Sequence, residues 1–158
     1  MATINATMSL SSDVTEYGFG ITKTMTMKKA GSTTGLELTT GLARRTFTAA
    51  NHVDLLVAGS GIAADVTASK SAKVYIKNVG SSSTDYFKVG IGKASTGSSE
   101  EGFDMADSSE KYTQLGRLYG GDWMLIPWNA TAATTHDVCV APSTAETMTL
   151  EYMAFVEE

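Results

Sequence analysis

The 158-residue chain has one cysteine, two prolines, two histidines and no long uninterrupted apolar run. The lone Cys139 excludes an intramolecular disulfide framework. No stretch approaches the roughly 18 apolar residues of a membrane-spanning helix, and no basic start followed by an apolar segment resembles a secretion signal. The sequence therefore predicts one soluble domain, made and folded in a reducing cytoplasm without disulfide or metal staples and without a membrane partner.

Charge is also scarce, at 18% of residues against 42% hydrophobic ones, and the net charge is −5. Residues 1–50 and 51–99 each carry a net charge of +2, whereas residues 100–158 carry −9. The overall sign argues against a general nucleic-acid binder. The asymmetry has two interpretations that the sequence leaves open. In the first, the oppositely charged faces attract a neighbouring subunit or a larger partner. In the second, the acidic surface only keeps the protein soluble.

Arrangements of residues that carry chemistry are missing too. His52 and His136 lie far apart in sequence, and neither has a metal-ligand partner at a recognised spacing. In "VGIGKAST" alanine follows Lys93 where a phosphate loop needs serine or threonine, and "VAGSG" has Ala58 where a nucleophile elbow needs glycine. A cupin-like barrel enzyme would need several clustered histidines, and the chain has only two, which argues against that class of enzyme. We therefore expect no catalytic, cofactor-binding or metal-binding residues, and no enzyme.

What the chain does contain is alternation of apolar and polar residues. "TINATMSL" has apolar side chains at every second position with polar residues between them, and "ITKTMTMKK" continues the pattern with Ile21, Met25 and Met27 on one side and threonines on the other. "DWMLIPW", "HDVCV" and "MTLEYMAFV" are further strand candidates. Only residues 51–59 and 61–69 have a composition that allows helix. We expect an all-β fold over residues 1–158, a single-domain β-sandwich or jelly roll of about eight to ten short antiparallel strands.

Three parts of this domain have their own expectations. The block "KVYIKNVGSSSTDYFKVGIG" has two strand-like runs around a serine-rich turn, which predicts a β-hairpin. Residues 94–111 are rich in serine, glycine and acids without any period, which predicts a long, exposed polar loop. Residues 1–30 end at a glycine-rich break, which predicts an extended N-terminal arm that adds a strand to a neighbour's sheet.

Both tryptophans lie in "GGDWMLIPWNA", where consecutive apolar residues make both faces of a strand apolar. Pro127 cannot donate to a sheet ladder, which indicates a sheet edge. Either both tryptophans fill the core of one subunit, or one of them faces a subunit interface. We predict that Trp123, Pro127 and Trp128 lie at an interface rim. We also predict that Arg44 and Arg45 pair there with the acidic C-terminal third.

The succession of "KVYIKNVGSSSTDYFKVGIG", "GRLYGGDWMLIPW" and "MTLEYMAFVEE" resembles small β-rich virion proteins of tailed bacteriophages, particularly those of marine and cyanobacterial hosts. The resemblance implies a structural virion protein that decorates or cements the capsid and assembles as a homo-oligomer, with a trimer favoured over a dimer. The alternative is a tail, neck or fibre component that binds a receptor or a glycan through exposed aromatics such as Tyr112, Tyr119 or Trp128. The implied location is the virion.

Overall fold

The computed structural model describes residues 4–12, 19–28, 35–36, 38–63, 71–92, 113–131 and 136–157. Within these residues the chain is all-β, with eleven strands in three antiparallel sheets and one 3₁₀ turn at Gly61–Ala63. The strands are β1 Asn5–Ser12, β2 Phe19–Thr26, β3 Leu38–Thr39, β4 Ala43–Phe47, β5 Val53–Leu56, β6 Ala72–Asn78, β7 Tyr86–Gly92, β8 Thr113–Tyr119, β9 Trp123–Trp128, β10 Asp137–Pro142 and β11 Met148–Val156. The expected all-β class is confirmed.

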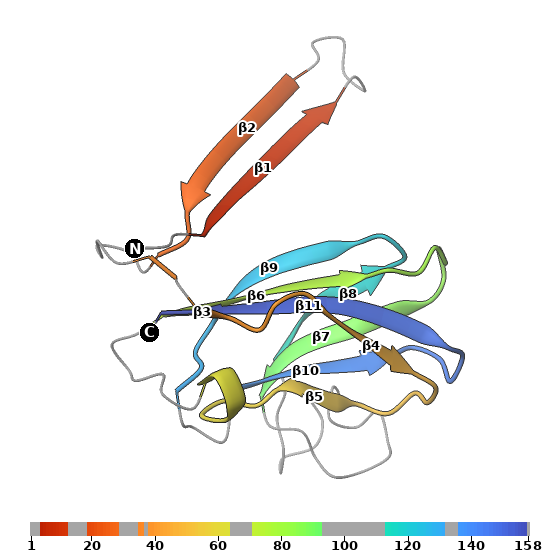
Figure 1. Cartoon of the computed structure of the whole chain (residues 1–158). Coiled ribbons are helices and arrows are strands. Elements are labelled where there is room, and N and C mark those ends of the chain that lie inside the picture. Colours follow the sequence, from red (N-terminus) through yellow and green to blue (C-terminus); the bar gives the residue numbers. More distant parts are fainter. Residues whose placement is uncertain are drawn as a thin grey trace.

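Two of the sheets form a sandwich (Figure 1). One, here called the β6 sheet, has the order β3-β11-β6-β9, with β4 also paired to β11; the other, the β7 sheet, has the order β5-β10-β7-β8. Alternate residues of each strand point inward, so Val74 and Ile76 of β6 face the same core as Phe87 and Val89 of β7, and all four are fully buried. This core holds the two sheets together by burial of apolar surface.

The third sheet is a two-stranded hairpin of β1 and β2 that projects from the sandwich (Figure 1). The strands pair over their whole length, from Asn5 opposite Thr26 to Ser12 opposite Phe19. One face carries hydroxyls that hydrogen-bond across the strands, as between Thr7 and Thr24 at 2.8 Å. The expected N-terminal arm thus contains a hairpin whose two strands pair with each other, and its addition to a neighbour's sheet stays a prediction.

The predicted hairpin between residues 73 and 92 is wrong, although both of its strands are present. β6 and β7 lie in different sheets, and the connection between them crosses from one layer of the sandwich to the other. The Ser82 side chain accepts hydrogen bonds from the backbone of Thr84 and Asp85, which fixes the polar turn at the crossing. Sequence alternation reports which residues a strand buries, but it does not report which strand lies beside it.

The two stretches considered as helices also differ from expectation. Residues 51–59 contain β5, and the next stretch begins with the single 3₁₀ turn, while residues 64–70 lie outside the described residues. Gly59 and Gly61 have φ of 69° and 57°, a left-handed conformation that ends the extended run at the turn. The predicted polar loop at 94–111 lies outside the described residues. In the described part of the chain no helix has the length and apolar character needed to cross a bilayer.

Candidate interaction surface

The base of the hairpin is attached to the outer face of the β6 sheet by a small apolar cluster separate from the sandwich core. Met27, Leu36 and Phe155 are its buried members. Residues packed around them come from the hairpin base and from the sheet: Ile4, Ala6, Tyr75, Leu125 and Met153. The backbone N–H of Met27 donates to the carbonyl oxygen of Ile4 at 2.7 Å, which joins the two strands below the hairpin. The cluster therefore anchors the hairpin on the sheet face turned away from the core.

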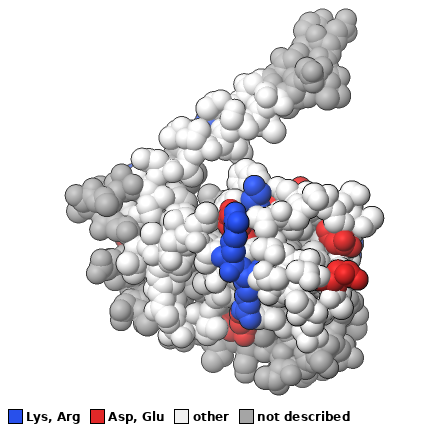
Figure 2. All heavy atoms as spheres, turned by 45° about the vertical axis from the view of Figure 1, so that its right-hand side comes forward, with Lys and Arg blue, Asp and Glu red and all other residues white. Residues whose placement is uncertain are grey.

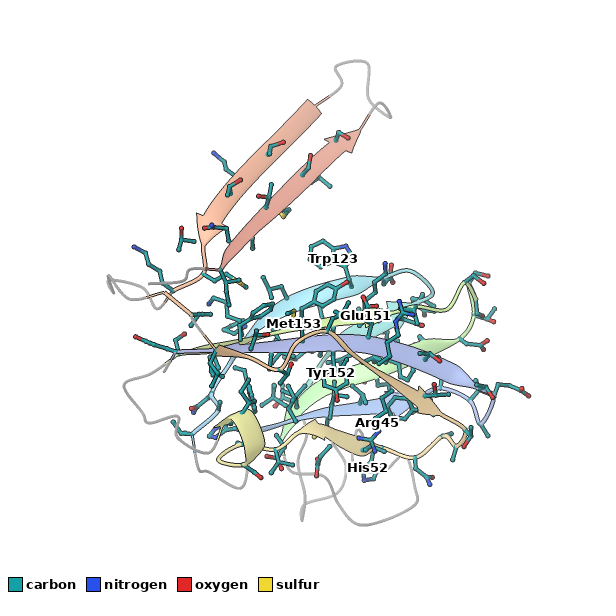
Figure 3. All side chains as sticks on the ribbon, in the orientation of Figure 1. Arg45, His52, Trp123, Glu151, Tyr152 and Met153 are labelled. Carbon is teal, nitrogen blue, oxygen red and sulfur yellow. The ribbon has the colours of Figure 1, made fainter. Side chains whose placement is uncertain are left out.

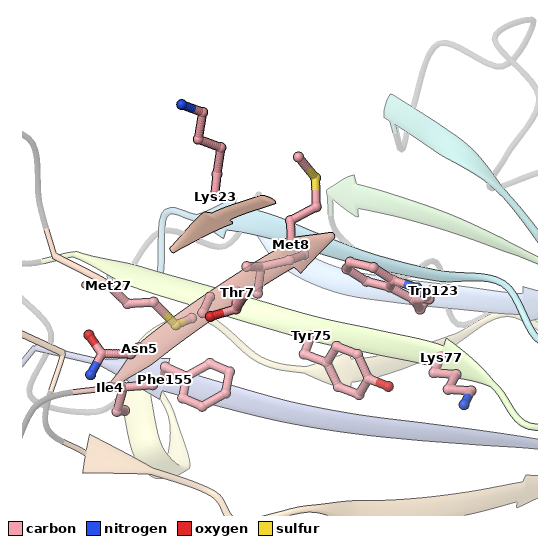
Figure 4. Close-up of a pocket in the computed structure, with 12 residues that line it drawn as sticks. Ile4, Asn5, Thr7, Met8, Lys23, Met27, Tyr75, Lys77, Trp123 and Phe155 are labelled. Carbon is pink, nitrogen blue, oxygen red and sulfur yellow. The ribbon is translucent and has the colours of Figure 1, made fainter. Parts of the chain in front are cut away.

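Beyond this anchor the hairpin and the sheet diverge and enclose a cleft of about 650 Å³ (Figure 4). The cleft is lined from the hairpin by Ile4, Asn5, Ala6, Thr7, Met8, Lys23 and Met27, and from the sheet by Tyr75, Lys77, Trp123, Leu125 and Phe155. Most of these side chains are apolar or aromatic, and the two charged ones are both lysines. The cleft is a weakly basic, largely apolar surface open to solvent.

The two tryptophans of β9 point to opposite sides of the β6 sheet. Trp123 is 55% exposed and lies on the cleft side, above the sheet and toward the hairpin (Figure 3), with its ring centroid 6.3 Å from that of Tyr75. Trp128 is 4% exposed and belongs to the sandwich core, where its indole N–H donates to the carbonyl oxygen of His136 at 2.6 Å. The sequence prediction that Trp128 lies at an interface rim is therefore wrong, because the core of its own chain encloses it.

Trp123 and Pro127 remain candidates for an interface. Strand β9 ends the order of the β6 sheet, which is the edge position that Pro127 indicated. Pro127 is exposed on the same outward side as Trp123, since their positions differ by an even number of residues along the strand. Their role at an interface stays a prediction.

A tight turn between β8 and β9 holds Trp123 in place. The backbone N–H of Asp122 donates to the carbonyl oxygen of Tyr119 at 2.9 Å, and the N–H of Gly121 donates to the carbonyl oxygen of Asn78 at 3.0 Å. The buried Asn78 side-chain amide also donates to the carbonyl oxygen of Leu118 and accepts from the N–H of Gly80. Asn78 thus ties the turn to the end of β6, so the strand that carries Trp123 starts from a fixed point.

Arg44 and Arg45 have different surroundings on β4. Arg44 pairs with Glu151 at 2.9 Å, with the arginine side chain 68% exposed and the carboxylate side chain 11% exposed. Arg45 donates to the carbonyl oxygen of Asp54 and places its guanidinium 5.4 Å from the centroid of the Phe47 ring. Arg44 therefore meets the acidic C-terminal third within its own chain, whereas Arg45 contacts β5 and the core edge. Figure 2 shows basic side chains in a line across one face of the sandwich, below a hairpin with very little charge.

Tyr75 gives the cleft a testable pH dependence. Burial raises the pKa of Tyr75 above its ordinary value of 10.0, and the negative charge of Glu151 raises it further. Because the folded pKa exceeds the unfolded one, the stability linked to Tyr75 is complete below pH 10 and is lost as pH rises through the folded value. We expect Tyr75→Phe to lose less stability than the wild type between pH 10 and 12 in urea titrations. Equal losses in both proteins would contradict this assignment.

A second aromatic group lies on the β7 sheet. The rings of Tyr86 and Tyr119 have centroids 5.2 Å apart, and the guanidinium of Arg117 lies 4.6 Å from the centroid of Tyr86. Tyr119, named above as a stacking candidate, is thus exposed but packed beside another tyrosine. Tyr112 lies outside the described residues.

The two histidines considered as metal ligands, His52 and His136, lie in the sandwich. His52 is buried, and the carbonyl oxygen of His136 serves the Trp128 indole. Among the residues described by the structure, no group of three histidine, cysteine or acidic side chains is placed to hold a metal ion.

Sequence reasoning did not foresee the cleft. Its walls come from β1, β2, β6, β9 and β11, whose closeness depends on how the hairpin leaves the sandwich. The one usable signal was the two-sided apolar pattern of "DWMLIPW", which required a second contact surface for that strand.

Comparisons with known proteins add no relative, since no family model, no curated protein and no solved structure matches the chain.

Proposed function

We propose that the protein is a structural component of a tailed-bacteriophage virion, which decorates or cements the capsid as a homo-oligomer through protein–protein contacts. The observation that carries the proposal is the pair of uncovered apolar surfaces, one on the hairpin and one around Trp123. Apolar surface of this kind on a projecting element is characteristic of proteins that associate. The resemblance in sequence pattern to phage virion proteins is the reason for proposing a phage capsid as the binding partner.

The composition supports the same proposal. The sandwich is stabilised by a continuous apolar core, and its described surface is rich in hydroxyl side chains and poor in charge. Such a subunit can associate over flat surfaces without long, strongly solvated side chains to displace, because serine and threonine cost little side-chain entropy when they become ordered. The −9 charge of residues 100–158 would add steering toward a basic partner.

The test is binding to capsids of the encoding phage that were assembled without this protein. We expect the purified protein to be oligomeric by light scattering and to sediment with the capsids up to a fixed stoichiometry that matches a lattice symmetry. Tails purified from the same phage serve as the control particle. Failure to sediment with capsids at saturating concentration would contradict the decoration role, and saturable binding to tails alone would assign the protein to the tail.

A second candidate is a glycan- or receptor-binding tail component, favoured by the exposed Trp123 beside Tyr75. An exposed aromatic ring provides a flat apolar surface on which a sugar ring can stack. This candidate predicts that Trp123→Ala abolishes binding to a host-derived glycan on an array while Trp123→Phe retains part of it. An array without any bound glycan would dismiss it.

A further inference from the structure

The apolar face of the hairpin begins in contact with the sandwich and continues beyond it. Ile4 and Ala6 pack on the cluster around Met27 and Phe155. Further along the same row of β1, Met8 and Leu10 are 49% and 51% exposed, and Ile21, which pairs with Leu10 across the hairpin, is 44% exposed. An isolated two-stranded sheet is at best marginally stable in water. The outer half of the row therefore needs a cover to remain ordered.

The outer face of the β6 sheet shows the same division. Phe155 and Leu125 contact the hairpin base, whereas Trp123, further along the sheet, is left exposed because the hairpin has diverged from it. The covered halves of the two surfaces already contact each other within one chain. The uncovered halves continue these surfaces, with Lys23 opposite Met8 on the hairpin and Lys77 opposite Trp123 on the sheet. The exposed apolar side chains of each half can cover those of the other.

We propose that these uncovered halves meet between two copies of the chain. The hairpin face formed by Met8, Leu10 and Ile21 docks on the Trp123 face of a second copy, and the second copy's hairpin docks in return. Such a contact is isologous and closes as a two-fold dimer. The inference deepens the proposed function and rests on it, since it specifies the contact that builds the homo-oligomer. It differs from strand addition because β1 is already paired with β2 and docks by its side chains.

The size of the hairpin favours the reciprocal arrangement. Each of its strands has eight residues. The uncovered outer half is about four residues of each strand, so at about 3.4 Å per residue and about 4.8 Å per strand it covers roughly 130 Å² in projection. A ring of three has one such contact at each interface, whereas a reciprocal dimer has two and so buries twice as much apolar surface in a single interface.

Cysteine pairs test this contact directly. Leu10→Cys and Trp123→Cys chains with different affinity tags are co-expressed, purified through both tags and oxidised. We expect a disulfide-linked hybrid dimer in which peptide mass spectrometry joins position 10 to position 123. The matched control is Ser9→Cys with Trp123→Cys, because Ser9 is adjacent to Leu10 but lies on the hydroxyl face, where it bonds to Thr22. The wild type reports any background from the buried Cys139.

A second measurement does not depend on oxidation. We expect light scattering to give a dimer for the wild type, and Leu10→Asp with Ile21→Asp to weaken self-association at least tenfold. Thr22→Asp, on the opposite face of the same strand, leaves the mass unchanged. The hairpin makes no contribution to the sandwich core, so circular dichroism should show each variant folded.

Several outcomes would overturn the proposal: a monomeric or trimeric wild type, cross-linking of position 10 to position 10, or equal cross-linking from position 9. Capsid binding by the wild type without the 10-to-123 link would reject this interface and leave the proposed function standing. A linked dimer that ignores capsids would reject the proposed function and leave the interface.

Discussion

Replacing Trp128 by alanine is expected to lower the free energy of unfolding by about 3 to 5 kcal/mol. Trp128 is almost completely buried in the sandwich core, and the substitution leaves a cavity the size of an indole ring between the sheets. It also leaves the carbonyl oxygen of His136 without its donor. Urea denaturation followed by circular dichroism at a fixed protein concentration measures the loss.

Trp123→Ala is the matched control, since the same side chain is removed from the same strand. Trp123 is more than half exposed, and we expect its removal to change the free energy of unfolding by less than about 1 kcal/mol when measured on the dissociated chain. The two substitutions thus compare the buried and the exposed side of the same strand. Comparable losses from both would mean that the two sides of β9 are not divided between core and surface as described.

Gly120→Ala is expected to cost more than about 2 kcal/mol, although it adds a single methyl group. A Cβ at this position would lie 2.6 Å from the carbonyl carbon of Ser81 and from the amide nitrogen of Ser82, so the clash is with backbone that cannot rotate away. The hydrogen bond from the Gly120 N–H to the Ser82 carbonyl oxygen, at 3.0 Å, holds the two turns at this close approach.

Gly20→Ala provides the control in β2. No atom lies within 4 Å of a Cβ built at Gly20, and its backbone is not left-handed. Alanine there restricts the unfolded chain at no steric cost, so the change should be neutral or stabilising by up to about 1 kcal/mol. Thermal unfolding of the two variants side by side decides the matter. A Gly120→Ala protein as stable as the wild type would contradict the close approach of the turns.

The strands were predictable because alternation is a local property. Ile4, Ala6, Met8 and Leu10 recur every second residue, and this row is the apolar face of β1. The partner of each strand was not predictable. β6 and β7 follow each other with a turn that suits a hairpin, yet each finds its neighbours elsewhere in the chain, because burying Val74 against Phe87 across the sandwich requires them to lie in opposite layers.

The candidate surface was predictable only in part. In an extended strand, positions 123 and 127 share one side and position 128 lies on the other, yet the sequence prediction placed all three residues at one rim. Sequence alone does not say which side faces the core. Arg44 and Glu151 are 107 residues apart, and only the pairing of β4 with β11 brings them together. Contacts of this kind depend on sheet order, which local patterns do not encode.

One face of the hairpin carries a row of hydroxyl pairs, which limits how many such hairpins can stack. Thr26 donates to the Asn5 side chain, and the Thr7–Thr24 and Ser9–Thr22 pairs continue the row along the hairpin. A hairpin that was apolar on both faces could stack without end, as the layers of a fibril do. With hydroxyls on one side, only the other side has an apolar face suited to packing, and the hydroxyl side stays hydrated. The arm therefore has one face for stacking, which opposes fibril-like growth.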